Sequence, residues 1–546
     1  MTKGAPSSSD GYDESPVGEQ NASVPLPDSW VLTPLASIAE IDPRSFCIVP
    51  AATLLPVHFI PMSAVTQEFG GIDVSATRPL AEVQKGYTSF LANDVLFAKI
   101  TPCMENGKLA VVPPLPYHIA FGSTEFHVLR ATPAAHPAWL AYFLSQTNFR
   151  KLARQNMTGS AGQMRVATTW LSSAAIPVPP VAEQARILEK LEELLPDLDA
   201  GIAELNVAQK KLSLYRQSLL KAAVGGTLTA PWREVQSQQP DEPKETGAQL
   251  LERVLTERRA RWEIKQLAKF KDQRKAPPND WRLKYSQPVQ PRIASLPDLP
   301  AQWAWASVEQ VASDESYALA IGPFGSNLKV SDYRDAGVPL VFVRNIRSRK
   351  YGGATTRYVT AEKAEELKAH GIEGGDVLVT KMGEPPGDSD VYPIGQSPAI
   401  ITADCIKVRC WPGLMEPAFL SAIINSYIGR QQIGPITQGV AQKKVSLGRF
   451  SFIALPLPPV DEQRKILEWL AAAEGEIGAQ EVAVLLALKK SAAQRQNILK
   501  AAFSGQLVPQ DPNDEPAAVL LERIRAERAA AGTGSGKRGR KTRALS

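Results

Sequence analysis

The fold is decided by the stretch PVPPVAEQARILEKL at residues 177–191, because it recurs as PLPPVDEQRKILEWL at residues 456–470. The two copies align without a gap from 177–228 onto 456–507, each position being matched 279 residues later (456 less 177). In this alignment 22 of the 52 positions are identical. Two unrelated surface helices would not keep one register for so long, so the chain contains an internal duplication.

Each copy has the pattern of one long helix. Prolines precede it, acidic residues such as Glu183 and Glu462 occupy its first turn, and Lys221 or Lys500 its last. Glycines follow, and apolar residues recur mostly three, four or seven positions apart, which predicts a seam against a partner helix. A helix of about 45 residues is about 65 Å long, too long to pack within one small domain. We predict that the two helices form an intramolecular coiled coil. The spacing does not fix their direction, but an antiparallel pair would be pseudo-twofold symmetric, and this is the arrangement we predict.

The duplication extends beyond the helices. Downstream, LLERVLTERRA from Leu250 matches LLERIRAERAA from Leu520, and upstream LPDSW at 26–30 matches LPAQW at 299–303. Between these landmarks the copies diverge, although NDVLFAKI (93–100) still corresponds to GDVLVTKM (375–382). We therefore expect two homologous but variable domains, each followed by a conserved helix.

The variable domains combine short alternating runs, typical of strands, with apolar-periodic stretches at 138–155 and 417–433 that predict short helices. The predicted fold class is therefore mixed α/β (α+β): two homologous recognition domains separated by two long helices. The predicted segments are a disordered leader (1–25), recognition domain 1 (26–176), a central helix (177–229), a charged linker with a helix (230–298), recognition domain 2 (299–455), a C-terminal helix (456–508) and a terminal helix with a basic tail (509–546).

Composition limits the classes of function. The 546 residues are 44% hydrophobic and 21% charged, with no run of about 18 apolar residues and no signal-peptide pattern, so we expect a cytoplasmic protein without membrane spans. The four cysteines and five histidines show no metal-ligand spacing and no disulfide pattern. A net charge of +5 permits nucleic-acid binding without requiring it.

Catalytic motifs are absent from the sequence. The segment GTGSGKRGR at 532–540 lacks the residues of a phosphate-binding loop, and no Pro-Pro pair follows the Asn or Asp of an aminomethyltransferase motif. A magnesium nuclease set of Asp241, Glu263 and Lys265 matches formally. Because Glu263 and Lys265 lie in a long charged helix, a solvated helix face explains them better, and we expect no catalysis, no metal and no cofactor in this chain.

Basic and amide side chains gather in the variable domains at loop-like places. The segments TGSAGQMRV (158–166) and TQGVAQKKV (437–445) place an amide and a cation at corresponding sites, which suggests the same role in both domains. Arginine pairs well with guanine, asparagine with adenine, and both lysine and arginine bind phosphates. The predicted DNA-binding residues are Lys99, Arg150, Lys151, Arg154, Gln163, Arg165, Arg344, Asn345, Arg347, Lys381, Gln442, Lys443 and Lys444.

These segments together resemble the specificity subunit of type I restriction-modification systems, over residues 26–530. IPVPPVAEQARI and LPLPPVDEQRKI are similar to the start of that family's conserved helices, and FAKITPCMENGK and GVPLVFVRNI to parts of its recognition domains. The resemblance implies a noncatalytic subunit in which each domain reads half of a bipartite site in double-stranded DNA. It also implies that the helices set the spacing and dock two modification subunits, which use S-adenosylmethionine, and that restriction subunits join for cleavage.

Two alternatives stay open from the sequence. One is a coiled-coil adaptor whose variable domains bind proteins, and which lacks the salt-dependent DNA affinity expected of a protein that contacts phosphates. The other is a nuclease that uses the set of Asp241, Glu263 and Lys265.

Overall fold

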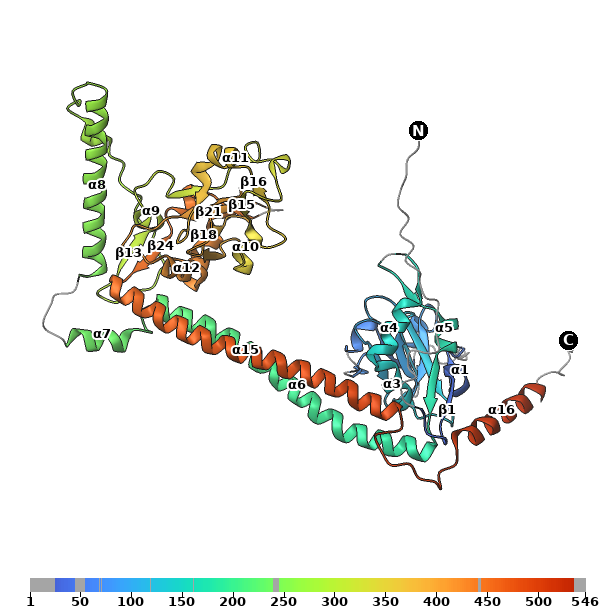
Figure 1. Cartoon of the computed structure of the whole chain (residues 1–546). Coiled ribbons are helices and arrows are strands. Elements are labelled where there is room, and N and C mark those ends of the chain that lie inside the picture. The colour runs from blue at the N-terminus through green and yellow to red at the C-terminus, as the bar shows by residue number, and fades with distance from the viewer. Residues whose placement is uncertain are drawn as a thin grey trace, which may run out of the picture. The chain divides into compact units, whose positions relative to one another are not determined.

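A computed structural model describes residues 25–534, except 45–54, 68, 70, 118, 161, 239–244 and 440–442. The chain divides into two compact units (Figure 1). Unit 1 comprises Met1–Asn206 with Leu485–Ser546, and unit 2 comprises Val207–Val484. Both boundaries fall inside a long helix. The predicted leader lies outside the described residues, as does the tail from residue 535.

Unit 1 contains two four-stranded sheets with the strand orders β2-β9-β6-β7 and β4-β3-β8-β5. In the second sheet β3 and β8 run parallel, while all other neighbours are antiparallel. Two further antiparallel pairs, β1 with β12 and β10 with β11, complete the unit. The strands are β1 (Val31–Pro34), β2 (Ala39–Ile41), β3 (Pro56–Ile60), β4 (Thr77–Pro79), β5 (Thr88–Leu91), β6 (Val95–Ala98), β7 (Leu109–Val111), β8 (Ile119–Gly122), β9 (Phe126–Ala131), β10 (Met157–Thr158), β11 (Arg165–Val166) and β12 (Ala175–Val178).

Unit 2 repeats this topology strand for strand, with every strand number raised by twelve. Its sheets have the orders β14-β21-β18-β19 and β16-β15-β20-β17, the parallel pair is β15 with β20, and the two-stranded pairs are β13 with β24 and β22 with β23. The strands are β13 (Ala304–Ser307), β14 (Leu319–Ile321), β15 (Val338–Val341), β16 (Tyr358–Val359), β17 (Gly371–Ile372), β18 (Val377–Thr380), β19 (Ser389–Val391), β20 (Ala399–Ile401), β21 (Cys405–Val408), β22 (Thr437–Gln438), β23 (Lys444–Val445) and β24 (Ala454–Leu457). The predicted homology of the two mixed α/β domains is confirmed.

Most helices follow the same duplication, although α7 and α10 of unit 2 have no α-helical counterpart among the described residues of unit 1. In unit 1 they are α1 (Leu35–Ile38), α2 (Leu80–Val83), α3 (Pro137–Ser145), α4 (Thr147–Gln155), α5 (Thr168–Ser173) and α16 (Ala517–Gly534). In unit 2 they are α7 (Ala230–Ser237), α8 (Gly247–Asp272), α9 (Val308–Val311), α10 (Val343–Ser348), α11 (Ala361–Glu366), α12 (Pro417–Asn425), α13 (Tyr427–Ile436) and α14 (Leu447–Phe450). The long helices α6 (Val181–Val224) and α15 (Val460–Phe503) have 44 residues each. No helix among the described residues is long and apolar enough to cross a membrane.

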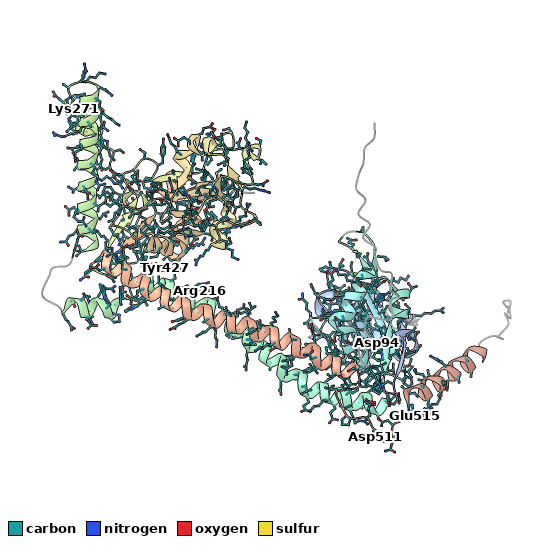
Figure 2. All side chains as sticks on the ribbon, in the orientation of Figure 1. Asp94, Arg216, Lys271, Tyr427, Asp511 and Glu515 are labelled. Atoms are coloured by element: carbon teal, nitrogen blue, oxygen red, sulfur yellow. The ribbon has the colours of Figure 1, made fainter. Side chains whose placement is uncertain are left out.

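The two long helices run antiparallel within each unit. In unit 1, Ile187 and Leu191 near the start of α6 share a core with Leu499 and Phe503 near the end of α15. In unit 2, Val224 at the end of α6 shares a core with Ile466 near the start of α15. Arg216 of α6, which Figure 2 labels, also forms ion pairs with Glu474 and Glu481 of α15, with nitrogen to oxygen distances of 2.9 and 2.8 Å. The predicted pairing of the long helices is confirmed.

Each long helix ends at a glycine for the same steric reason. Gly226 and Gly505 have φ values of +79° and +74°, in the left-handed region that favours glycine. A Cβ atom there would lie 2.5 Å from Pro300 in unit 2 and 2.4 Å from Pro27 in unit 1. The LPDSW and LPAQW segments therefore pack directly against the helix ends, which explains why both recur.

The short helices differ from the sequence expectation. The stretch at 138–155 forms two helices rather than one, because Gln146 is extended, with φ −61° and ψ 134°. The stretch at 417–433 is likewise divided, at Ser426. The break lets α3 pack in the core while α4 turns its basic residues outward.

Candidate nucleic-acid interface

The hairpin β10–β11 lies against the end of β6 in unit 1. Lys99 follows that strand, and its carbonyl accepts a hydrogen bond from the Val166 N–H at 2.9 Å. The hairpin turn needs Gly159, whose φ is +128° and whose added Cβ would lie 2.8 Å from the Gln163 carbonyl. The structure therefore brings the predicted residues Lys99, Gln163 and Arg165 together.

A carboxylate holds Arg165 in place. Its guanidinium donates two hydrogen bonds to Glu125, at 2.9 and 2.8 Å, and a third to the Gln163 carbonyl at 3.2 Å. The Arg165 hydrogen bonds lower the pKa of the Glu125 carboxyl, and the nearby Lys99 adds to this effect. The Arg165 side chain stays 41% exposed, so it presents a positioned cation to solvent.

The predicted basic residues of α4 are linked to this hairpin through the loop at residues 101–107. The Arg150 guanidinium donates to the Glu105 carbonyl at 3.0 Å, and Arg154 forms an ion pair with the Glu105 carboxylate at 3.0 Å. The same loop bonds the hairpin, because the Thr101 N–H donates to the Met164 carbonyl at 3.0 Å. Lys151, on the same helix, is exposed.

Unit 2 has the corresponding arrangement. The Val445 N–H of hairpin β22–β23 donates to the Lys381 carbonyl at 3.0 Å, as Val166 does to Lys99. Lys443 pairs with Glu384 at 2.9 Å, and Lys444, which matches Arg165, is exposed. Gln442 lies outside the described residues. The Lys381 ammonium donates to the Ala403 carbonyl at 3.3 Å.

The basic run at 342–353 forms a short helix, α10, rather than the loop that its composition suggested. The Asn345 side chain bonds the backbone on both sides of this helix. Its amide oxygen accepts from the Phe342 N–H and its NH₂ donates to the Lys350 carbonyl, both at 3.0 Å. Since Asn345 is also buried, its amide stabilises the local backbone. Arg344 stacks on Phe342 at 4.2 Å and donates to the Thr355 carbonyl at 3.0 Å.

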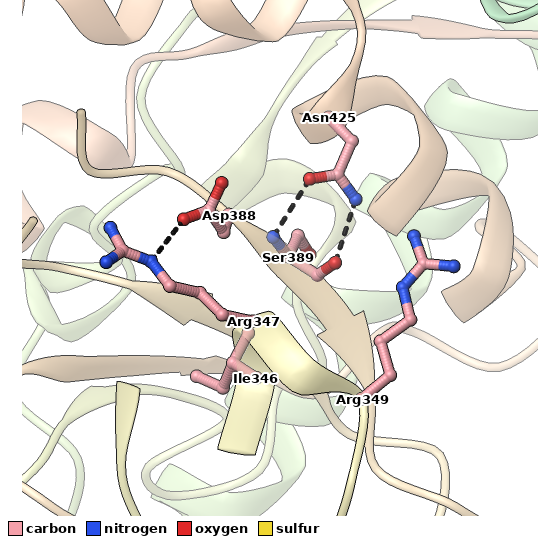
Figure 3. A pocket seen from close by; sticks show the side chains of 6 residues that line it. All are labelled: Ile346, Arg347, Arg349, Asp388, Ser389 and Asn425. Carbon is pink, nitrogen blue, oxygen red and sulfur yellow. Dashed lines mark hydrogen bonds and ion pairs between the residues drawn. The ribbon is translucent and has the colours of Figure 1, made fainter. Parts of the chain in front are cut away.

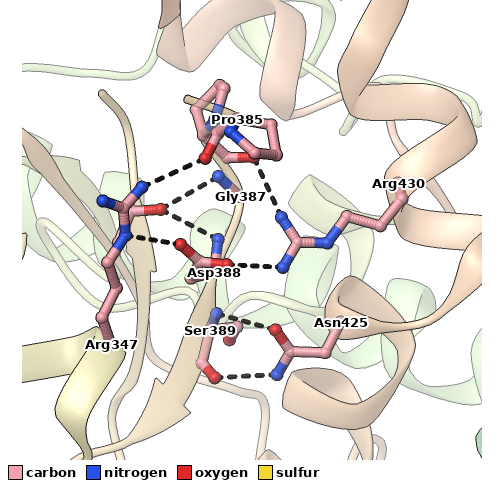
Figure 4. A network of polar contacts seen from close by, with 9 residues as sticks. Arg347, Pro385, Gly387, Asp388, Ser389, Asn425 and Arg430 are labelled. Atoms are coloured by element: carbon pink, nitrogen blue, oxygen red, sulfur yellow. Dashed lines mark hydrogen bonds and ion pairs between the residues drawn. The ribbon is translucent and has the colours of Figure 1, made fainter. Parts of the chain in front are cut away.

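Arg347 belongs to a polar network centred on Asp388 (Figure 4). Arg347 donates to one Asp388 carboxylate oxygen at 2.7 Å, and Arg430 of α13 donates to the other at 2.6 Å. Burial raises the pKa of Asp388, but the hydrogen bonds from Arg430 and Arg347 outweigh it, so the net pKa lies below the ordinary value. The network joins α10 and α13 to the loop at 381–388, which also contacts hairpin β22–β23 through Glu384 and Lys443.

An open cavity of about 290 Å³ lies beside this network (Figure 3). Arg347, Arg349, Asp388 and Asn425 are among its lining residues. The Asn425 amide is bonded to the backbone of Ser389, at 3.0 and 2.8 Å. Arg349 has no ion-pair partner among the described residues, so its guanidinium is available to an anion.

Arg430 and Arg349 were missing from the predicted site. Arg430 lies 279 residues after Lys151, the same shift that relates the long helices, so the repeat itself could have identified it. Arg349 stands in the basic run already singled out, but only the structure places it at the cavity.

The nuclease alternative finds no support in the described residues. Glu263 faces Arg259 and Arg282, at 3.3 and 3.5 Å, whereas Lys265 pairs with Asp314 at 2.8 Å. Asp241 lies outside the described residues. Within them no group of His, Cys, Asp and Glu is arranged to hold a metal ion. Burial raises the pKa of the Cys405 thiol to about 12, which keeps it protonated and unreactive.

The chain contains two homologous α/β domains, each with a basic hairpin, and two long antiparallel helices. This combination defines a class of protein built from an internal duplication. Residues 27–206 match the family model described as the type I restriction modification DNA specificity domain. The specificity subunits of the type I restriction enzymes EcoAI and EcoEI of Escherichia coli are each 25% identical to this chain, over 83% of it and 78% of their own length. Residues 27–206 therefore match that domain family, and the resemblance to type I specificity subunits that the sequence predicted is confirmed.

The fold comparison agrees with this assignment. A chain from a solved structure, described as concerning complex assembly and conformational transition of the type I restriction-modification system, has a TM-score of 0.61 and 20% identity. The match covers 88% of this chain and 100% of that one.

Proposed function

We propose that this chain is the noncatalytic specificity subunit of a type I restriction-modification complex in the cytoplasm. Each variable domain reads one half of a bipartite site in double-stranded DNA, and α6 with α15 sets the distance between the halves. Two modification subunits, carrying S-adenosylmethionine, dock on the helices and methylate adenine, and restriction subunits join them for cleavage. The observation that carries this proposal is the strand-for-strand repeat, with a cationic hairpin at the same place in both copies.

The test is to map methylated adenines across the host genome with and without this gene. We expect a two-part motif that disappears on deletion. Replacing residues 26–176 by the corresponding segment of another specificity subunit should change one half of the motif and leave the other half intact. Unchanged methylation after deletion would contradict the proposal, and a change in both halves would contradict the domain assignment.

Arg165 gives a residue-level prediction. Because Glu125 already orients its exposed guanidinium, Arg165→Ala should weaken binding of a site-containing duplex by about tenfold, as expected for one lost cation contact to DNA. Lys444→Ala, at the matching place in unit 2, should have an effect of similar size. Fluorescence anisotropy with the assembled complex measures both.

The control for this pair is Lys368→Ala, which removes an exposed lysine that pairs with Glu365 of α11 and belongs to neither hairpin. It should leave the dissociation constant within about twofold. An Arg165 variant that binds as well as this control would remove the hairpin from the interface.

A further inference from the structure

The last third of α8 and the segment that follows it form a cationic arm, defined here as residues 265–285 (Figure 1). The arm contains seven Lys and Arg residues and two Asp residues, a net charge of +5 that equals the charge of the whole chain. No function described above for the variable domains involves this arm. By the 270-residue shift that relates Leu250 to Leu520 (520 less 250), the arm corresponds to residues 535–546, which lie outside the described residues and contain five Lys and Arg residues and no acidic residue.

The base of the arm is fixed to the recognition domain of unit 2. Leu250 and Val254, near the start of α8, are buried in its core. Farther along, the Arg258 guanidinium donates to the Glu309 carbonyl at 3.2 Å, and Arg261 stacks on Trp411 at 4.7 Å. The last link is the ion pair between Lys265 and Asp314 at 2.8 Å.

Aromatic side chains make the arm rigid beyond that point. After α8 ends, the chain turns back so that Trp281 stacks on Trp262, with ring centroids 5.8 Å apart and planes 21° apart. Phe270 packs edge-on against Trp281 at 6.2 Å, and Tyr285 contacts Trp262 at 5.3 Å. A solvated, purely solubilising helix needs no such cluster.

Five of the seven cations of the arm have no ion-pair partner among the described residues; the other two are Lys265 and Arg282. No ion pair within the described residues involves Lys269, Lys271, Arg274, Lys275 or Lys284, all of which are exposed (Figure 2 labels Lys271). These are the conditions that favour binding to a polyanion, because cations already neutralised by carboxylates gain little from phosphates, whereas free cations release counterions from DNA.

We propose that the cationic arm binds the phosphate backbone of duplex DNA that flanks the half-site read by residues 299–455. This proposal rests on the proposed DNA-binding function and adds to it a contact outside the half-site. From Lys265 to the end of α8 at Asp272 the helix rises about 10 Å, the length of about three base pairs. The complex should therefore contact DNA beyond the half-site that residues 299–455 read.

The test uses the assembled complex and duplexes that end at the motif or extend 10 base pairs beyond one half. The wild type should gain affinity from the extension next to the half assigned to residues 299–455. In Lys269→Ala/Lys271→Ala/Arg274→Ala/Lys275→Ala this gain should be lost, about 10- to 100-fold at low salt, and the slope of log affinity against log salt should fall by up to about 3.6. Changing the three lysines to arginine instead should preserve the gain.

Failure of the cationic-arm proposal can be distinguished from failure of the proposed function, because mapping the methylated motif tests that function first. A wild type that gains nothing from that extension would overturn the proposal, as would an alanine variant that behaves as the wild type. If the alanine variant loses its modification subunits but keeps the flank-dependent affinity, the arm binds protein and the proposal is wrong.

Discussion

Glu462→Gln should destabilise unit 2 by about 3–5 kcal/mol, the cost of removing one partner from a buried ion pair. Glu462, in the first turn of α15, is fully buried. Its carboxylate forms an ion pair with Arg233 and accepts hydrogen bonds from the Trp303 indole at 2.8 Å and the Thr229 hydroxyl at 2.6 Å. The amide keeps the volume but loses the charge, so Arg233, whose side chain is only 16% exposed, is left without a counterion.

The matched variant is Glu183→Gln, at the repeated position in unit 1. Glu183 accepts from the Trp30 indole at 2.9 Å and from the Gln510 amide at 2.5 Å, both of which are neutral. The nearest arginine, Arg186, pairs instead with Asp514 at 2.6 Å. Because no cation is stranded, we expect a change within about 1 kcal/mol.

The pH dependence of stability gives a further test at Glu183. Burial raises the pKa of Glu183, although its hydrogen bonds oppose the shift. A raised pKa in the folded state means that the native protein holds this proton more tightly than the unfolded chain does. The group's stabilising contribution is therefore complete below the ordinary carboxyl pKa and is lost as the pH rises through the folded-state value. Glu183→Gln removes this loss, so the variant should gain stability relative to the wild type on going from pH 4.5 to pH 7.

Hydrogen exchange resolves the units without assuming one unfolding transition. Glu462→Gln should speed exchange in β13 and β24 and leave β1 and β12 protected. An exposed control, Arg464→Ala in the same turn of α15, should change neither pair, since its side chain is 63% exposed. Equal effects of the two glutamine variants would show that the Arg233 ion pair adds nothing.

The duplication was predictable because the long helices carry it in a strict register. Ile187 and Ile466 lie at equivalent positions and both are fully buried, as the apolar spacing indicated. The strand-forming runs were also predictable, since Val95–Ala98 and Val377–Thr380 are short β-branched or aromatic stretches bounded by turn residues.

What the sequence could not show are the contacts made across long separations. Phe503 packs on Trp139 with ring centroids 4.2 Å apart, although 364 residues (503 less 139) separate them. The residue types around Asn345 suggested that it contacts a DNA base, but its amide oxygen accepts a hydrogen bond from the backbone N–H of Phe342. Helix propensity likewise could not place the break at Gln146, because tertiary contacts override local propensity. One such contact is the hydrogen bond that the Gln184 side chain accepts from the His136 N–H just before α3.

Gln184 and Gln463 occupy the same position in the two copies of the repeated stretch at 177–191 and 456–470. They support the second large prediction. Gln463 is fully buried, and its NH₂ group donates to the carbonyls of Leu414 and Pro458, at 2.8 and 3.0 Å. Its oxygen accepts from the Glu416 N–H at 2.8 Å. Gln184 makes the same three bonds in unit 1, to Ala134, Pro179 and His136. Gln463 thus connects α15 to the loop before α12, and Gln184 connects α6 to the loop before α3.

Gln463→Met keeps the length of the side chain and leaves three buried backbone groups without partners, so we expect a loss of about 3 kcal/mol. Gln463→Glu keeps the shape but places a carboxylate oxygen against two carbonyls, which should cost more than the methionine at pH 7. The acid form of that glutamate has an O–H that can donate to Leu414, so burial and this bond should raise its folded-state pKa. Its stability should therefore recover as the pH falls, whereas that of the methionine variant should not. Urea unfolding of both variants at pH 5 and pH 7, with exposed Glu468→Gln as the control, measures this ordering. A glutamate variant no less stable than the methionine one at pH 7 would show that the side chain acts through its volume and not through its two donated hydrogen bonds.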